Sequence, residues 1–476
     1  MTEHDHFMID GQWMPASGSN RLPVIEAATE DQLGSIPVAT EADIDRAVDA
    51  ARRAGPAWGA LQPAERADAL EAFADAVQAV TAEVAQTVSR QNGMPIALSR
   101  FLEGKFPLIL LRYYAELIRT RPTEELRESA HNRTLVRRTA LGVAGAIVPW
   151  NYPVTLAIAK VAPALAAGST VVVKPTPATS LDSYILADAA LRAGLPAGVV
   201  NWVPAGREVG AYLVEHSGVD MIAFTGSTGA GRRIAEVCGR LIRPVTLELG
   251  GKSAAIVLED ADLGSIGHEF FAATLANNGQ TCVSSSRILA PRSRYADVVD
   301  FVADLADGAT IGDPLDPTTR VGPLASSEHR DRVEGFIARG RKDGARVVAG
   351  GGRPAGLSRG WFVEPTVFAD VESRSTLGQE EIFGPVLSVI PYDDEEDALR
   401  IANDTPYGLA GTIWSADATY ATALARRIES GTVGVNGYDI DPHAPFGGVK
   451  HSGLGREFGP EALEAFEQLQ SIYLPR

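Results

Sequence analysis

Residues 143–175 read VAGAIVPWNYPVTLAIAKVAPALAAGSTVVVKP, in which two short apolar runs flank a longer apolar stretch. The short runs, Val143 to Val148 and Ser169 to Pro175, have the length and β-branched content of buried strands, and the stretch between them, Val154 to Ala166, is long enough for a helix. Strands that alternate with helices are typical of a parallel sheet covered on both faces. This segment therefore predicts an α/β fold built on a doubly wound parallel sheet.

The same alternation continues along the chain and returns in a second region between residue 253 and about residue 430. In the first region the pattern predicts further helices over 180–193, 208–215 and 230–238, and further strands over 199–203 and 221–224. In the second region it predicts strands over 283–289 and 386–390, and helices over 293–305 and 327–339. Outside these regions it predicts short strands within 7–39, helices from residue 40 to about residue 119, and strands over 134–139 and 470–474.

Length and charge limit the class of protein. With 476 residues the chain is too long for one ordinary core, so two or three domains are expected. Its net charge of −17, from 43 basic and 60 acidic residues, argues against a nucleic-acid partner or an anionic membrane surface. The longest apolar stretch, residues 141–168, is broken by prolines, by Asn151 and by Lys160, and it predicts buried core rather than a membrane helix.

Cysteine and histidine usage narrows the chemistry further. Only two cysteines are present, which excludes a disulfide framework and fits a reducing compartment. Residues 1–6 are acidic and polar and lack a signal-peptide pattern, so a cytoplasmic location is expected. The eight histidines show no paired metal-ligand spacing, and the sequence contains no GxGxxG, Walker A or GxSxG motif. We therefore expect neither a metal site nor a standard Rossmann fingerprint.

The two cysteines have different surroundings. Cys282 follows Asn278-Gly279-Gln280-Thr281 in a polar, turn-rich stretch, whereas Cys238 follows apolar residues of an expected helix. Glu248 lies 34 positions before Cys282, in a second glycine-bearing turn. A thiol and a carboxylate in such turns predict a covalent enzyme with a separate general base. The alternative, a cysteine that serves only as a small buried apolar residue, suits Cys238 better.

Three further motifs lie where expected strands end. The Asn151 amide could donate to a developing oxyanion, or it could cap a helix. Lys174 ends an expected parallel strand, where ligands bind in open α/β sheets, although a solvated lysine is the simpler interpretation. Gly226 and Ser227 open a helix and could approach a phosphate, or they could form an ordinary turn. Each motif alone is weak evidence for a functional site.

Two loops complete the set of candidates. Glu381 and Phe383, in Glu380-Glu381-Ile382-Phe383-Gly384-Pro385, could offer a carboxylate to a ribose and an aromatic face to a ring, or they could lie in a turn beside a strand. Phe446 stands in a glycine-rich loop that could be a pocket wall or irregular surface.

Together these segments, in their order along nearly the whole chain, resemble the aldehyde dehydrogenase superfamily. The resemblance is carried by Pro149–Pro153, Lys174-Pro175, Phe224–Thr228, Leu247–Lys252, Gly279–Cys282, Glu381–Pro385 and Pro445–Gly448. It implies a cofactor-binding domain (1–121 and 141–249), a catalytic domain (250–450), and a small oligomerisation element with the C-terminal strand (122–140 and 451–476). Members of the superfamily are usually dimers or tetramers, so a homo-oligomer, such as a homotetramer, is expected.

The resemblance also implies a reaction, the oxidation of an aldehyde to a carboxylic acid with NAD, or with NADP, as cofactor. Cys282 would attack the aldehyde as a thiolate, and the Asn151 amide with the Cys282 main-chain N–H would hold the oxyanion. Glu248 would activate the water that hydrolyses the thioester. The implied cofactor-binding residues are Lys174, Pro177, Gly226, Ser227, Trp150, Leu249, Glu381 and Phe383. The implied substrate-pocket residues are Tyr152, Leu156, Ala159, Thr281, Val283 and Phe446.

Two departures from the superfamily pattern bear on specificity. Many NAD-preferring members carry a glutamate where this chain has Pro177, so NADP could also serve. Leu156 and Ala159 are small for their positions, and Ile440, Asp441 and His443 precede Phe446, which suggests a roomier, partly polar pocket.

A CoA-acylating enzyme and a catalytically inactive protein on the same fold are the alternatives, and the presence of Glu248 counts against the first.

Overall fold

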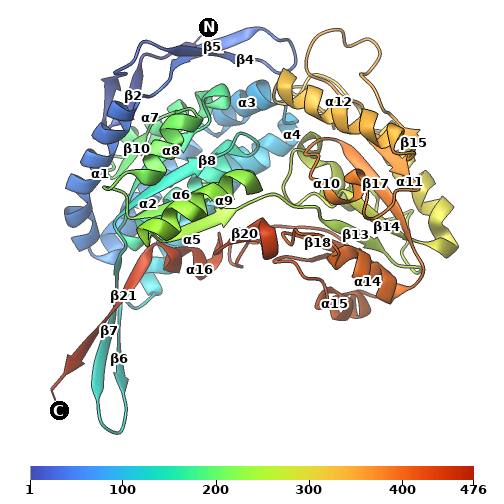
Figure 1. Ribbon diagram of the computed structural model, residues 1–476. Helices are drawn as coiled ribbons and strands as arrows, with labels where there is room; N and C mark the ends of the chain where they lie inside the picture. The colour runs from blue at the N-terminus through green and yellow to red at the C-terminus, as the bar shows by residue number, and fades with distance from the viewer. Residues whose placement is uncertain (1, 476) are drawn as a thin grey trace.

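The computed structural model describes residues 2–475, which form two sheet-centred lobes and a projecting three-stranded arm (Figure 1). The sheet of the first lobe has eight strands in the order β20-β12-β11-β8-β9-β10-β2-β3. Its strands are β2 (His6–Ile9), β3 (Gln12–Pro15), β8 (Val143–Val148), β9 (Thr170–Pro175), β10 (Val200–Trp202), β11 (Met221–Thr225), β12 (Val245–Glu248) and β20 (Gly453–Leu454). The five strands from β12 to β10 are parallel, and the outer strands are antiparallel.

Helices cover both faces of this sheet because consecutive strand residues point to opposite sides. Ala144, Ala146, Val171 and Val173 face the layer that contains α6, whereas Val143 and its alternating neighbours face α1 and α8. The helices of this lobe are α1 (Glu41–Ala60), α2 (Pro63–Gln78), α3 (Thr81–Asn92), α4 (Ile96–Ser99), α5 (Phe106–Thr120), α6 (Pro153–Ala167), α7 (Leu181–Arg192), α8 (Arg207–Glu215), α9 (Thr228–Leu241) and α16 (Gly459–Ala465), with a π-helical segment η1 (Arg100–Lys105) before α5 and a 3₁₀ turn η2 (Pro177–Thr179).

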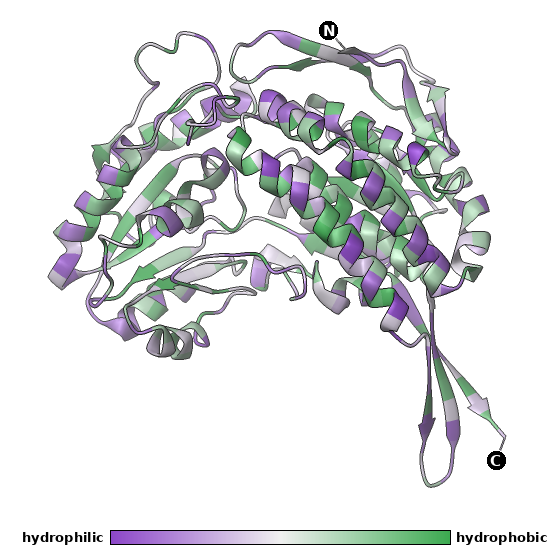
Figure 2. Ribbon diagram, turned by 180° about the vertical axis from the view of Figure 1, so that it is seen from behind, coloured by the Kyte–Doolittle hydropathy of each residue, from purple (hydrophilic) through white to green (hydrophobic). Residues whose placement is uncertain are grey.

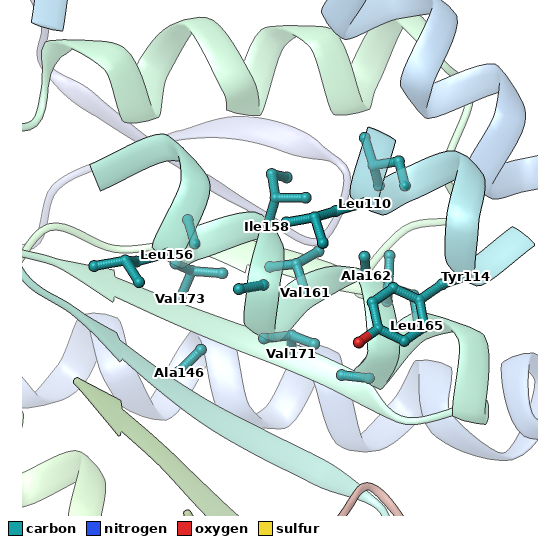
Figure 3. Close-up of a cluster of buried hydrophobic side chains, with 14 of the residues drawn as sticks. Leu110, Tyr114, Ala146, Leu156, Ile158, Val161, Ala162, Leu165, Val171 and Val173 are labelled. Atoms are coloured by element: carbon teal, nitrogen blue, oxygen red, sulfur yellow. The ribbon is translucent and has the colours of Figure 1, made fainter. Parts of the chain in front are cut away.

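Helix α6 is the most deeply buried of them, with every one of its residues buried. Figure 3 shows Ile158, Val161 and Leu165 of this helix packed between Leu110 and Tyr114 of α5 and the side chains of the sheet. This packing places α6, which directly follows β8 in the chain, between α5 and the sheet.

The second lobe repeats the parallel plan with seven strands in the order β15-β16-β17-β14-β13-β18-β19. Its strands are β13 (Ala254–Val257), β14 (Arg287–Pro291), β15 (Arg346–Ala349), β16 (Thr366–Ala369), β17 (Val386–Tyr392), β18 (Gly411–Trp414) and β19 (Gly434–Val435). Its helices are α10 (Gly267–Leu275), α11 (Tyr295–Asp307), α12 (Ser327–Lys342), α13 (Thr376–Gln379), α14 (Glu395–Asn403) and α15 (Ala418–Ala425), with 3₁₀ turns η3 (Ala276–Gly279), η4 (Arg292–Arg294) and η5 (Lys450–Ser452).

Two small antiparallel units complete the chain. The arm consists of β6 (Glu124–Glu128), β7 (Arg133–Ala140) and β21 (Glu467–Leu474), in the order β21-β7-β6. Figure 2 shows the arm extending away from both lobes, with the C-terminus near its tip. A sheet of β1 (Thr2–Glu3), β4 (Arg21–Ile25) and β5 (Gln32–Pro37) lies across the top of Figure 1.

The predicted α/β fold with parallel sheets is confirmed, and most predicted elements appear within a few residues of their expected bounds. The strand predicted over 283–289 starts only at Arg287, because Ser284, Ser285 and Ser286 form turn and loop hydrogen bonds instead of a ladder. The first of the helices predicted from residue 40 onward runs from Glu41 to Ala60. The domain limits remain a prediction, and β20, within the range 451–476, pairs with β12 of the first sheet.

Among the described residues, no helix is both long enough and apolar enough to cross a membrane.

Leu165→Ala tests the packing that anchors α6. The side chain is fully buried between α5 and the sheet, so its truncation leaves a cavity and should cost about 2–5 kcal/mol of unfolding free energy. Leu22→Ala, at a position that is 41% exposed, is the control and should change stability by about 0.5 kcal/mol or less. Thermal unfolding compares the two variants, and equal losses would contradict the role assigned to this core.

Candidate active site

Cys282 lies in a loop whose backbone is bent by three consecutive left-handed residues. Asn277, Asn278 and Gly279 have φ values of 51°, 61° and 72°. A Cβ atom on Gly279 would lie 2.1 Å from the carbonyl oxygen of Gly384, so only glycine fits at this approach of two loops. The bend turns the chain out of α10 and brings Cys282 to the junction of the two lobes.

Side-chain amides anchor this loop in its bent form. Asn278 Nδ2 donates to the carbonyl oxygens of Gly93 at 2.8 Å and Pro323 at 2.9 Å. Gln280 Oε1 accepts from the main-chain N–H of Ala325 at 2.9 Å. Because these groups of Asn278 and Gln280 are buried and paired, their hydrogen bonds stabilise the bent loop.

Asn151 connects the first lobe to this loop. It follows β8, and its Nδ2 atom donates to the carbonyl oxygen of Gln280 at 3.0 Å, two residues before Cys282. Its own carbonyl accepts from Asn277 Nδ2 at 3.0 Å and from Asn92 Nδ2 at 3.2 Å. An amide NH₂ has two hydrogens, so one N–H fixes the side chain while the other remains for a ligand.

Most of the predicted pocket residues belong to the large hydrophobic core of the first lobe. Tyr152, Leu156, Ala159, Val283 and Phe446 belong to one buried cluster, and Cys282 packs against it. The Tyr152 hydroxyl and Thr281 Oγ1 lie 2.7 Å apart. Ile440 also packs on this cluster, whereas Asp441 and His443 are exposed.

The thiol of Cys282 lies in an environment that disfavours its ionised form. Burial raises its pKa, and the negative charges of Glu381, Glu248 and Glu457 raise it further. The thiol is therefore protonated at neutral pH in this state. Burial also raises the pKa of Cys238, which is fully enclosed on α9.

Glu248 ends β12 with both carboxylate oxygens buried and unpaired among the residues described. Burial raises its pKa well above the usual range, the charge of Glu457 adds to this, and Lys160 and Arg456 oppose it. A Cβ atom on Gly447 would lie 2.5 Å from Glu248 Oε1, so the glycine-rich loop closes directly over this carboxylate. A buried carboxylate without a partner is expensive to keep for stability alone, and it is a candidate base.

The buried pair of Lys160 and Glu457 was missed by sequence reasoning. Lys160, on α6, forms an ion pair with Glu457, and its Nζ atom donates to Thr225 Oγ1 at 2.6 Å. The charges of both residues act on Glu248. The available signal was a single lysine in an otherwise apolar helix, whereas nothing near Glu457 in the sequence indicates its partner.

The candidate cofactor residues lie along the carboxyl edge of the first sheet, where ligands bind in open α/β folds. Lys174 is the penultimate residue of β9, and its Nζ atom donates to the carbonyl oxygen of Ala205 at 2.8 Å. Burial lowers the pKa of Lys174 to about 8. Pro177 begins the 3₁₀ turn after β9. After β11, Gly226 precedes Ser227, which caps α9.

The second lobe contributes Glu381 and Phe383 from the loop before β17. Glu381 Oε1 accepts from the N–H of Gly251 at 3.0 Å, and burial raises the pKa of this carboxyl to about 7. The Phe383 ring meets the Trp150 ring edge to face, with centroids 5.5 Å apart. Leu249 packs against Gly231 of α9, so it lies beneath the helix start rather than at an edge.

Within residues 2–475, no group of three or more His, Cys, Asp or Glu side chains is arranged to hold a metal ion.

Comparisons with known proteins agree with this geometry. A family model described as the aldehyde dehydrogenase family matches residues 13–472. A geranial dehydrogenase from Castellaniella defragrans is 54% identical over 475 residues, which cover 99% of each chain. A Mycobacterium tuberculosis aldehyde dehydrogenase complexed with NAD+ has a TM-score of 0.98 and 43% identity, covering 100% of this chain and 99% of that one.

A variant of aldehyde dehydrogenase C from Pseudomonas syringae, complexed with NAD+ and octanal, has a TM-score of 0.95 and 37% identity, and the match covers 98% of this chain and 96% of that one. The fold class and the enzyme class that the motifs predict are confirmed by these matches. The chain belongs to the aldehyde dehydrogenase family.

Proposed function

We propose that this protein oxidises an aldehyde to the carboxylic acid with a nicotinamide cofactor, by covalent catalysis at Cys282. The proposal rests on two observations: Asn151 donates to the carbonyl oxygen of Gln280, two residues before Cys282, and the charge of Glu248 acts on the Cys282 thiol. Cys282, Asn151 and Glu248 each have the chemistry that one step requires: a nucleophile, an oxyanion donor and a base.

In the first step, the Cys282 thiol releases its proton to solvent water, and Sγ bonds to the carbonyl carbon of the aldehyde. The carbonyl oxygen becomes an alkoxide, which accepts from the free N–H of Asn151 and from the main-chain N–H of Cys282. Because Gln280 holds the other hydrogen of the Asn151 amide, the donor is already aligned and needs no reorientation. A nicotinamide cofactor bound at this junction would supply the hydride acceptor, and loss of hydride from the carbon would leave a thioester on Cys282.

In the second step, Glu248 removes a proton from a water molecule, and the oxygen of that water attacks the thioester carbon. The C–S bond breaks, the carboxylic acid leaves, and the proton taken up by Glu248 passes to the Cys282 sulfur, which restores both groups. A carboxylate with a raised pKa is a stronger base once it is ionised, so the burial of Glu248 favours this role. Lys160 and Glu457 adjust the charge around Glu248 and complete its buried setting.

The residues present fit a dinucleotide at the junction of the lobes. Ser227 and Gly229 are exposed at the start of the 14-residue helix α9, whose first N–H groups lack intrahelical acceptors and suit a pyrophosphate. Lys174 and Glu381 would hold the two riboses, and Phe383 and Trp150 would border the nicotinamide. NAD is the expected cofactor, because two relatives of the same fold are NAD+ complexes.

We propose an apolar aldehyde as the substrate. The cluster against which Cys282 packs is apolar and aromatic, and it contains the predicted pocket residues Leu156, Ala159 and Phe446. A relative of 54% identity carries the name geranial dehydrogenase, and another was crystallised with octanal. Geranial and octanal are therefore the first members of a test panel that also contains short and polar aldehydes.

One assay separates the proposed reaction from its alternatives. Purified protein is incubated with the aldehyde panel and NAD+ or NADP+, with and without CoA, and NAD(P)H absorbance and the acyl product are followed. Free carboxylic acid formed without CoA supports the proposal. A requirement for CoA indicates an acylating enzyme, and no turnover with any aldehyde indicates an inactive protein on this fold.

Cys282→Ala should abolish aldehyde oxidation, because no other thiol reaches the site, while leaving cofactor binding intact. Cys238→Ala is the matched control: it should keep full turnover and lose only stability, since its side chain is buried on α9. Steady-state rates and calorimetric titration with NAD+ measure both effects. Normal turnover by Cys282→Ala would remove the nucleophile from this account.

Glu248→Gln should keep the first step and lose the second. We expect a rapid burst in which one NAD(P)H forms per active site. Turnover then stops because the acyl-enzyme accumulates and is not hydrolysed. Stopped-flow absorbance with excess aldehyde measures the burst. Unimpaired steady-state turnover would show that another base deacylates the enzyme.

The presence of Pro177 should weaken the preference of the enzyme for NAD+ over NADP+. A carboxylate at this position would repel a 2′-phosphate by a few kcal/mol, on the order of a hundredfold or more in selectivity. Pro177 cannot do so, and Lys174 supplies a nearby cation. We expect the kcat/KM values for NAD+ and NADP+ to lie within about a thousandfold of each other. A larger preference for NAD+ would mean that a different residue discriminates.

The arm is proposed to mediate assembly into a homo-oligomer, a dimer or a tetramer. Within the described part of the chain, the edge strand β21 pairs on one side only, and Leu469 and Tyr473 are 66% and 80% exposed. Removal of residues 469–476 should therefore give monomers or aggregates. Light scattering measures the assembly state, and an intact oligomer after truncation would refute this role of the arm.

A further inference from the structure

His329 joins three segments that do not adjoin in the sequence. It lies in the first turn of α12, where Ser326 caps the helix by accepting from the His329 N–H at 3.1 Å. Its ring is close to Trp150, which follows β8, and to Phe383, which precedes β17. Nothing in the sequence motifs singles out this histidine.

The three rings form a closed cluster. The Trp150 and His329 centroids are 5.1 Å apart at 63°, those of Trp150 and Phe383 are 5.5 Å apart at 89°, and those of His329 and Phe383 are 6.0 Å apart at 67°. Each pair has the edge-to-face geometry that aromatic rings prefer. A change at any one ring therefore leaves a gap beside the other two.

A hydrogen bond joins the same residues through the backbone. His329 Nε2 lies 2.6 Å from the carbonyl oxygen of Phe383, and because a carbonyl only accepts, Nε2 carries the hydrogen. Burial lowers the pKa of His329 to about 4, so the ring is neutral at neutral pH and Nδ1 is unprotonated. The donor is consequently present throughout the physiological range.

The bonded carbonyl belongs to a residue in an unfavourable conformation. Phe383 has φ = 65°, a left-handed value that an aromatic residue rarely adopts without support. The following residue, Gly384, packs closely on both sides. A Cβ atom on Gly384 would lie 2.6 Å from Val333 of α12, and a Cβ atom on Gly279 of the Cys282 loop would lie 2.1 Å from the Gly384 carbonyl oxygen. The Phe383 segment is thus clamped between α12 and the loop that carries Cys282.

We propose that His329 is a positioning residue for the cofactor site: its ring and its Nε2–H hold Phe383 in the left-handed conformation that presents the Phe383 ring and Glu381 to the cofactor. The proposal rests on the cofactor site proposed above. His329 acts through Phe383 and Trp150 and touches no reacting atom, so it should govern cofactor affinity rather than the attack of Cys282 on the aldehyde.

The test uses two substitutions and one control. His329→Gln keeps a neutral side-chain N–H donor, whereas His329→Leu keeps an apolar side chain and loses the donor. His268→Gln, at a side chain of α10 that is 85% exposed, is the control. Steady-state kinetics give KM for the cofactor and for the aldehyde, and calorimetric titration gives the Kd of NAD+ in each protein carrying Cys282→Ala.

We expect His329→Leu to raise the Kd and KM of NAD+ about tenfold while the KM of the aldehyde changes less than twofold. His329→Gln should recover most of this loss, and His268→Gln should behave as the wild type. An unchanged Kd in His329→Leu, or a loss in His329→Gln as large as in His329→Leu, would overturn the proposal. If the Cys282→Ala protein with His329 intact binds neither NAD+ nor NADP+, the proposed function itself fails, and the two outcomes are thereby distinguished.

Discussion

The hydrogen bond from the Asn151 side chain to the Gln280 carbonyl, 3.0 Å long, connects the two lobes at the point where the chemistry would occur. One partner follows β8 of the first sheet, and the other lies two residues before Cys282 in a loop of the second lobe. Neither lobe alone contains both the proposed nucleophile and the proposed oxyanion donor. Two features hold the partners of this bond in place. Helix α6 is packed in the core on one side, and buried amides anchor the Cys282 loop on the other.

Close backbone approaches complete the same junction. Gly250 lies against Glu381, Gly251 against the Cys282 carbonyl oxygen, and Gly447 against Glu248, with distances from an added Cβ of 2.2, 2.6 and 2.5 Å. At Gly251 an added side chain would collide with the backbone of the Cys282 loop, and at Gly250 and Gly447 it would displace a buried carboxylate. The glycines of the motifs therefore act mainly by permitting contact between lobes, and the carboxylates are buried by the backbones that pass over them.

Much of the fold could be predicted from the sequence because local patterns decide it. The apolar runs at 143–148 and 169–175 became β8 and β9 since both faces of that sheet are buried. The strand expected at 283–289 starts late because its first residues serve the Cys282 loop, so a tertiary requirement overrides an apolar pattern there. Strand β6 carries five exposed residues, and no apolar periodicity marks it.

Only part of the candidate site could likewise be predicted from the sequence. The seven motifs place Cys282, Glu248 and Asn151 on their loops and strand ends, but which of them meet could be inferred only through the family resemblance. Lys160 and Glu457 lie 297 positions apart, and His329 and Phe383 lie 54 apart, so their pairing depends on the fold and leaves no local signal.

The central claim is that the acyl group is carried on Cys282, and a direct measurement is peptide mass spectrometry after an acid quench during the first turnover. Wild-type protein is mixed with NAD+ and octanal, quenched on the millisecond scale and digested. The account predicts an added octanoyl mass on the Cys282 peptide, which appears with the NADH burst and is absent when NAD+ is omitted. Product formation with an unmodified Cys282 peptide at every time point would contradict it.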